Sequence, residues 1–150
     1  MDRETNGPFH ILVVDDEADI EPLINQRMRP RIRSGKYRFS FASDGVKALE
    51  TLSRNPSIDM IITDINMPNM DGLTLLGRVA LINPNVRSVV ISAYSDMRNI
   101  RTAMNRGAFD FIVKPFDFED LEIVIKRTQA HIAWWKQALE SGEKNAENKG

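Results

Sequence analysis

The sequence predicts a doubly wound α/β domain, in which helices cover both faces of a five-stranded parallel sheet. Short apolar runs rich in β-branched or aromatic residues alternate with longer stretches that have helical spacing. Five strands interleaved with five helices are typical of a parallel sheet between two helical layers. The length of 150 residues suits one domain with a sizeable core.

The predicted strands and helices alternate along the whole chain. Strands are expected over residues 9–14, 37–42, 59–63, 86–92 and 109–113. Helices are expected over residues 17–29, 44–54, 71–82, 96–106 and from 117 onward. Residues 11–14 and 60–62 are apolar without alternation, as in strands that are buried on both faces.

Capping residues mark several of these helix boundaries. Asp44 and Asp71 each precede a glycine where a helix should begin, and an aspartate can cap the free N–H groups there. Gly107 follows the fourth helix, in the position of a left-handed C-terminal residue. Asp117 and Asp120 have the spacing of a capping box at the start of the last helix.

Composition excludes several classes of function. The net charge of −1 gives the chain no electrostatic reason to contact nucleic acid or an anionic membrane. The lack of cysteine excludes disulfides, thiolate zinc sites and a cysteine nucleophile, and it fits a cytoplasmic location. Residues 1–8 are polar rather than a signal peptide, and no apolar run approaches the roughly 20 residues that span a bilayer.

Chemically reactive side chains gather where the predicted strands end. Asp15 and Asp16 follow the first strand, Asp64 follows the third, Ser92 ends the fourth, and Lys114 follows the fifth. In a doubly wound sheet, ligands bind beyond the carboxyl ends of the strands, near the point where the strand order reverses. If the first and third strands are neighbours, the three aspartates converge on one small volume.

Such a group of carboxylates predicts a cation site. At about 4 Å separation and an effective dielectric near 20, each pair repels by several kcal/mol, which a proton or a cation relieves. Oxygen ligands with space for water and phosphate suit Mg²⁺, with Mn²⁺ as a substitute. One aspartate could then attack phosphorus and form an acyl phosphate, near the positive charge of Lys114 and the hydroxyl of Ser92. His10 and His131 lie far from these positions in sequence and are interpreted as incidental.

Four motifs resemble the receiver domains of two-component response regulators. They are Val-Val-Asp-Asp-Glu at 13–17, Thr-Asp-Ile-Asn-Met-Pro at 63–68, Ile-Ser-Ala-Tyr at 91–94 and Val-Lys-Pro-Phe at 113–116. The resemblance covers roughly residues 8–130. It implies a flavodoxin-like, three-layer α/β/α fold with strand order 2-1-3-4-5.

The resemblance also implies roles for individual residues. Asp64 would accept a phosphoryl group from a sensor histidine kinase or a phosphotransfer protein. Asp15, Asp16 and the backbone carbonyl of Asn66 would hold Mg²⁺ together with Asp64, and Lys114 would pair with the phosphoryl group. The domain would be a switch, and an enzyme only in assisting its own phosphorylation and dephosphorylation.

In this family a hydroxyl residue and an aromatic residue transmit the signal. The matching positions here are Ser92, which would move toward the phosphoryl oxygens, and Phe111, which would turn inward behind it. Phenylalanine can fill the vacated space but offers no hydroxyl to a partner. A plain core aromatic is the alternative interpretation for the resting role of Phe111.

Three alternative classes fit the sequence less well. A flavodoxin-type module for a small molecule would need a phosphate-cradling loop after the first strand, where this chain has Asp-Asp-Glu at 15–17. A haloacid-dehalogenase-like phosphatase would place two aspartates two residues apart after that strand. A degenerate receiver used only for dimerisation is disfavoured by the complete acidic set.

A basic stretch at residues 27–38 makes the connection after the first helix longer than a simple receiver needs. It holds five arginines and one lysine, and Pro30 should end or kink the helix there. We interpret this stretch as a solvated basic loop. The alternative is a docking surface for an acidic partner or an output domain.

The last helix carries an apolar stripe beyond the expected end of the domain. Its members have the 4-3 spacing of a coiled-coil seam: Leu121, Ile125, Thr128, Ile132, Trp135 and Leu139. The first half of this stripe must pack on the sheet. The remaining seam would consist of Thr128, Ile132, Trp135 and Leu139. It would form a parallel homodimer, or the helix would be a rod that joins the domain to an output domain. The alternative is a stripe that only covers its own domain, but Ile132, Trp135 and Leu139 would then be exposed with nothing beneath them.

The expected domain limits follow from these features. Residues 1–8 form a polar N-terminal segment, 9–130 the receiver domain, 131–140 the extended helix, and 141–150 a polar disordered tail. Too few residues follow Leu139 for an output domain. The chain is therefore expected to be a stand-alone receiver or a receiver cut from a longer protein.

Overall fold

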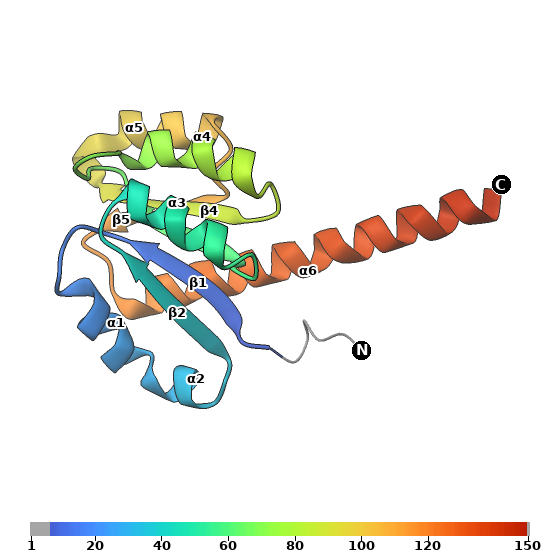
Figure 1. The fold of residues 1–150 in the computed structure, drawn as a ribbon, viewed down its shortest axis with the longest axis horizontal. Coiled ribbons are helices and arrows are strands. Elements are labelled where there is room, and N and C mark those ends of the chain that lie inside the picture. Colours follow the sequence, from blue (N-terminus) through green and yellow to red (C-terminus); the bar gives the residue numbers. More distant parts are fainter. Residues whose placement is uncertain (1–6, 150) are drawn as a thin grey trace.

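The computed structural model describes residues 7–149, with side chains as far as residue 142. It contains one parallel sheet with the strand order β2-β1-β3-β4-β5 (Figure 1). The strands are β1 (Phe9–Val14), β2 (Tyr37–Ala42), β3 (Met60–Asp64), β4 (Arg87–Ala93) and β5 (Asp110–Lys114). The predicted fold class and strand order are confirmed.

Helices cover both faces of this sheet. They are α1 (Ile20–Arg27), α2 (Arg29–Arg33), α3 (Gly45–Arg54), α4 (Gly72–Ile82), α5 (Met97–Asn105) and α6 (Phe118–Lys149), with a 3₁₀ turn η2 (Tyr94–Asp96) before α5. The strands are buried on both sides, and successive side chains along a strand pack against opposite helical layers. Ile11 and Val13 pack with α1 and α6, whereas Leu12 and Val14 pack with α3 and α4. The carboxyl ends of all five strands therefore lie at one edge, between the two helical layers.

The connection between α1 and β2 differs from the expected basic loop. The first helix ends at Arg27, and a separate short helix, α2, follows with Pro30 as its second residue. Proline is tolerated there because the first N–H groups of a helix have no partner within the helix. Two of the basic side chains are also paired, because Arg31 and Lys36 both contact the carboxylate of Glu122 on α6.

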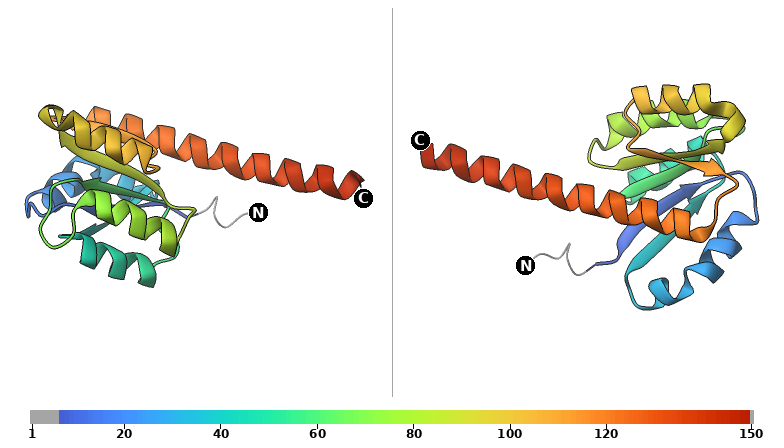
Figure 2. Two further views of the ribbon diagram at one scale, coloured as in Figure 1. Left: turned by 90° about the horizontal axis from the view of Figure 1, so that it is seen from above. Right: turned by 180° about the vertical axis from the view of Figure 1, so that it is seen from behind.

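Helix α6 extends far beyond the sheet (Figure 2). Thr128 is fully buried, Ile132 is half-buried, and Trp135 and Leu139 are 44% and 52% exposed, so the outer part of the predicted seam has no cover within the described chain. Residues 141–149 continue the helix, where we expected a disordered tail. Lysine and glutamate, which favour helix, occur twice each there.

Two further expectations concern the ends of the chain and the membrane. Residues 1–6 of the expected polar N-terminal segment, and residue 150, lie outside the described residues. Within residues 7–149, no helix combines the length and the apolar character that crossing a bilayer requires.

Candidate functional site

The three predicted aspartates meet at the carboxyl edge of the sheet. Asp64 is the last residue of β3, and Asp15 and Asp16 directly follow the neighbouring strand β1. One carboxylate oxygen from each residue lies within 4.8 Å of the other two. Asp15 and Asp64 are buried, at 7% and 5% exposure, whereas Asp16 is exposed. The structure thus brings together two buried acids with one that faces solvent.

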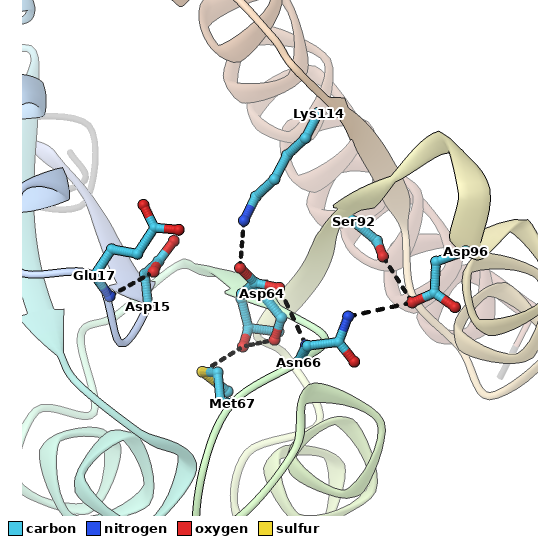
Figure 3. Close-up of polar contacts among 9 residues, drawn as sticks. Asp15, Glu17, Asp64, Asn66, Met67, Ser92, Asp96 and Lys114 are labelled. Atoms are coloured by element: carbon cyan, nitrogen blue, oxygen red, sulfur yellow. Dashed lines mark hydrogen bonds and ion pairs between the residues drawn. The ribbon is translucent and has the colours of Figure 1, made fainter.

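The carboxylate of Asp64 is fixed by one donor on each oxygen (Figure 3). The Nζ of Lys114 donates to Oδ2 at 2.5 Å, and the backbone N–H of Asn66 donates to Oδ1 at 3.1 Å. Lys114 ends β5, two strands away from β3, so its side chain reaches across the sheet edge. Asp64 is therefore held in one orientation at the centre of the site.

The electrostatics of the site favour a cation. Burial raises the pKa of Asp15 above its usual range, with a further contribution from the charge of Asp64, although the backbone N–H of Glu17 donates to Asp15 Oδ1 at 2.8 Å and opposes the rise. Burial acts to lower the pKa of Lys114, but the hydrogen bond to Asp64 and its charge outweigh burial and raise that pKa. Three carboxylates thus face one ammonium group. At 4.8 Å the repulsion between two of them is about 3 kcal/mol for an effective dielectric near 20.

Gly72 has a steric role that the sequence did not reveal. Its backbone N–H donates to the carbonyl of Ile65 at 2.8 Å, which brings the start of α4 against the end of β3. A Cβ at this position would lie 2.4 Å from the carbonyl oxygen of Asp64 and 2.9 Å from the Cα of Ile65. Only glycine fits without moving the backbone of Asp64. The sequence signal, Asp71 followed by Gly72, indicated only a helix start.

Ser92 belongs to a second hydrogen-bonded group beside Asp64. Its buried hydroxyl donates to Asp96 Oδ2 at 3.0 Å, and the side-chain amide of Asn66 donates to the same oxygen at 3.4 Å (Figure 3). The amide of Asn99 donates to Asp96 Oδ1 at 2.7 Å. These donors, Asn99 foremost, hold the pKa of Asp96 below its usual range, although partial burial opposes them. The sequence pattern predicts only a helix start at residue 96 and gives no sign of this hydrogen-bonded group.

Phe111 is the remaining predicted site residue, and the two histidines were interpreted as incidental. Phe111 is half-buried and packs on the apolar cluster between the sheet and α4 and α5, where it pairs in register with Val90. His10 is buried next to Ser40, with Nε2 and the serine Oγ 2.7 Å apart. His131 accepts a hydrogen bond from Arg87 at 3.2 Å. Among the described residues, neither histidine is hydrogen-bonded to Asp15, Asp16 or Asp64; the backbone N–H of His10 donates to Asp59 at 2.9 Å.

A family model described as the response regulator receiver domain matches residues 11–126, which is most of the chain. This chain belongs to the response regulator receiver family. A receiver domain has a phosphoacceptor role in two-component signalling, so the predicted family and this general function are confirmed.

Curated relatives differ in how much of their length the receiver domain matches. The transcriptional regulatory protein ZraR of Klebsiella oxytoca is 32% identical over 121 residues, which are 81% of this chain and 26% of that protein. Sporulation initiation phosphotransferase F of Bacillus subtilis is 30% identical over 117 residues, which are 78% of this chain and 90% of that protein. The chain thus spans about a quarter of the ZraR proteins and nearly all of the sporulation protein.

Solved structures share the same architecture. The response regulator receiver domain protein from Clostridium thermocellum matches with a TM-score of 0.71 and 30% identity, over 87% of this chain and 98% of that one. The receiver domain of NtrX from Brucella abortus matches with a TM-score of 0.68 and 32% identity, over 79% of this chain and 96% of that one.

Proposed function

We propose that Asp64 is the phosphoacceptor of this receiver domain. The observation that carries the proposal is the position of its carboxylate: nearly buried, fixed on both oxygens by Lys114 and Asn66, and crowded by Asp15 and Asp16. A carboxylate oxygen can attack phosphorus only if it is oriented and the surrounding negative charge is compensated. Asp15 is held by its own turn and Asp16 faces solvent, so Asp64 is the best-placed nucleophile of the three.

The donor in this proposal is a phosphohistidine of a sensor histidine kinase or a phosphotransfer protein. A carboxylate oxygen of Asp64 forms a bond to phosphorus, the P–N bond of the donor breaks, and the electron pair stays on the imidazole. Lys114 already contacts Asp64 Oδ2 and is in place to neutralise an oxygen of the incoming group. The chain is then a signalling switch that assists its own phosphorylation and dephosphorylation, rather than an enzyme acting on other substrates.

Mg²⁺ is the cofactor in this proposal, and Mn²⁺ would substitute. The carboxylates of Asp15, Asp16 and Asp64, with the backbone carbonyl of Asn66, would hold the ion, and these hard oxygen donors fit it. When bound, the ion supplies positive charge that offsets the carboxylates and the phosphoryl oxygens. The raised pKa of Asp15 supports this assignment, because it reflects a buried carboxylate without enough positive charge around it.

Ser92 and Phe111 are the proposed switch residues. Ser92 is the next residue after Ile91, which pairs in register with Asp64, so its hydroxyl lies on the strand beside the phosphoacceptor. Movement of Ser92 toward a phosphoryl group would open space next to the half-buried ring of Phe111. The phosphoryl group adds close to two negative charges, which can bias two arrangements of β4, β5 and α5.

The proposed partners beyond the donor act through α6. We propose a parallel homodimer along Ile132, Trp135 and Leu139, the part of the predicted seam that the domain itself does not fully bury. Trp135 and Leu139 are exposed with the spacing of a coiled-coil seam, whereas Thr128 already packs inside its own domain. Several relatives are far longer than this chain, which supports an output domain attached beyond α6 in the full protein. A cytoplasmic location is part of the proposal, as is general for response regulators.

Phosphorylation from a small-molecule donor tests the assignment of Asp64. We expect acetyl phosphate with Mg²⁺ to add one phosphoryl group to the full chain, measured by intact-protein mass spectrometry, and chelation of the metal to abolish it. Asp64→Asn should show no mass shift. Asp71→Asn is the matched control, because residue 71 caps α4 and asparagine caps equally well. Equal phosphorylation of Asp64→Asn and the wild type would refute the proposal.

A further inference from the structure

The aspartate before α5 behaves differently from the aspartates before α3 and α4. Asp44 accepts a hydrogen bond from the backbone N–H of Lys47, and Asp71 accepts one from Thr74, both at 2.8 Å. These are ordinary N-caps, three residues from cap to donor. Asp96 occupies the same position before α5, yet its side chain caps no backbone N–H. Asp96 therefore stands at an N-cap position but does not cap the helix with its side chain.

The carboxylate of Asp96 instead connects three segments of the functional site. It accepts from Ser92 at the end of β4, from Asn66 in the loop after β3, and from Asn99 in the first turn of α5. A serine hydroxyl has one proton to donate. Ser92 therefore cannot donate to Asp96 and to a phosphoryl oxygen at the same time.

We propose that Asp96 is a latch in the unphosphorylated chain and a helix cap in the phosphorylated one. In the first state its carboxylate holds Ser92 and Asn66 away from the phosphoryl position. Once Asp64 is phosphorylated, Ser92 donates to a phosphoryl oxygen, and the released carboxylate turns to the backbone N–H of Asn99, three residues on. The exchange involves hydrogen bonds only. It rests on the proposed role of Asp64 and makes Asp96 a positioning residue for the switch.

The exchange couples the phosphoryl group to α5 without a long chain of contacts. A phosphoryl group has about two negative charges and three acceptor oxygens, so it competes well against a single carboxylate for the Ser92 proton. The carboxylate that loses Ser92 is not left unpaired, because a capping position is available to it. Coupling of this kind is reciprocal: a chain that lacks the latch should bind a phosphoryl group more tightly.

Beryllium trifluoride, a phosphoryl mimic, tests the latch in the 150-residue chain with Mg²⁺ present. Asp96→Ser removes the carboxylate but keeps a residue that caps helices well. We expect this variant to bind the mimic about tenfold more tightly in an NMR titration, the size of one charge-assisted hydrogen bond. The backbone amide of Asn99 in the free variant should also lie near its position in the mimic-bound wild type. Asp71→Ser, the same exchange at a helix start that has no contact with Ser92, should bind like the wild type.

The outcomes separate the latch from the role of Asp64. Unchanged or weaker binding by Asp96→Ser, with the Asn99 amide unmoved, would overturn the latch while leaving Asp64 as the phosphoacceptor. Wild-type binding of the mimic by Asp64→Asn would instead overturn the proposed function itself. If Asp96→Ser does not fold, as judged from the dispersion of its amide signals, Asp96→Asn replaces it. That variant keeps the shape, loses the charge, and should also bind more tightly than the wild type.

Discussion

Replacing Gly72 with alanine should destabilise the domain and slow its phosphorylation. The new Cβ would lie 2.4 Å from the carbonyl oxygen of Asp64, where ordinary contact begins at 3.4 Å, so the two must separate by 3.4 − 2.4 = 1.0 Å. Both sides of the contact are backbone, and no side-chain rotation relieves it. Overpacking of this kind costs about 1–3 kcal/mol of unfolding free energy. The same displacement moves the proposed nucleophile, and an error of about 1 Å can cost ~100-fold in rate.

Gly77 provides a matched control within the same helix. A Cβ there meets nothing within 4 Å, so Gly77→Ala should stabilise the protein by about 0.5–1 kcal/mol through helix propensity. Urea denaturation followed by far-ultraviolet circular dichroism measures both variants, and acetyl phosphate with Mg²⁺ gives the phosphorylation rates. If Gly72→Ala were as stable as Gly77→Ala and were phosphorylated at the wild-type rate, the close approach of α4 to Asp64 would be refuted.

Two further predictions concern α6. Arg31, aided by Lys126 and Lys36, lowers the pKa of Glu122 against the opposing effect of burial. A carboxylate whose pKa is lower in the folded protein than in the unfolded chain stabilises the fold above the unfolded pKa. That stabilisation is lost as the pH falls through the folded pKa. Glu122→Gln should therefore be about 1 kcal/mol less stable than the wild type at pH 7. Thermal denaturation should show that difference shrink once the pH falls below the ordinary value of 4.5; a difference that stays constant as the pH is lowered would contradict this. Sedimentation should show a dimer that Trp135→Asp disrupts and Trp134→Asp, beside the seam, does not; a monomeric wild type at high concentration would refute the seam.

The sheet could be predicted from the sequence because its strands are buried on both faces. Continuous apolar residues such as 11–14 and 60–62 leave few other interpretations. The predicted ends of β3, β4 and β5 were each one residue early. Their last residues, Asp64, Ala93 and Lys114, still pair with the neighbouring strands although two of them are charged. A polar residue at a strand end is typical of a turn in the sequence, but Asp64 and Lys114 extend their strands here.

The remaining features depend on geometry that no periodic pattern encodes. Pro30 predicts the end of the first helix, and α1 does end before it, at Arg27. Proline is equally suited to the start of a helix, and the short helix α2 that contains Pro30 was not predicted. Gly72 and Asp96 were read as ordinary helix starts. Their contacts with Asp64 and Ser92 arise from how two loops fold back on the strand ends. Sequence spacing predicts which strand ends meet but not the conformation of the loops that follow them.

The most direct test of the account is the identity of the phosphorylated residue. After treatment of the full chain with acetyl phosphate and Mg²⁺, borohydride reduction of the acyl phosphate converts the modified aspartate to homoserine, which peptide mass spectrometry locates. The account predicts homoserine at Asp64 alone. Homoserine at Asp15 or Asp16, or its absence from all three in a chain that has gained a phosphoryl group, would contradict it.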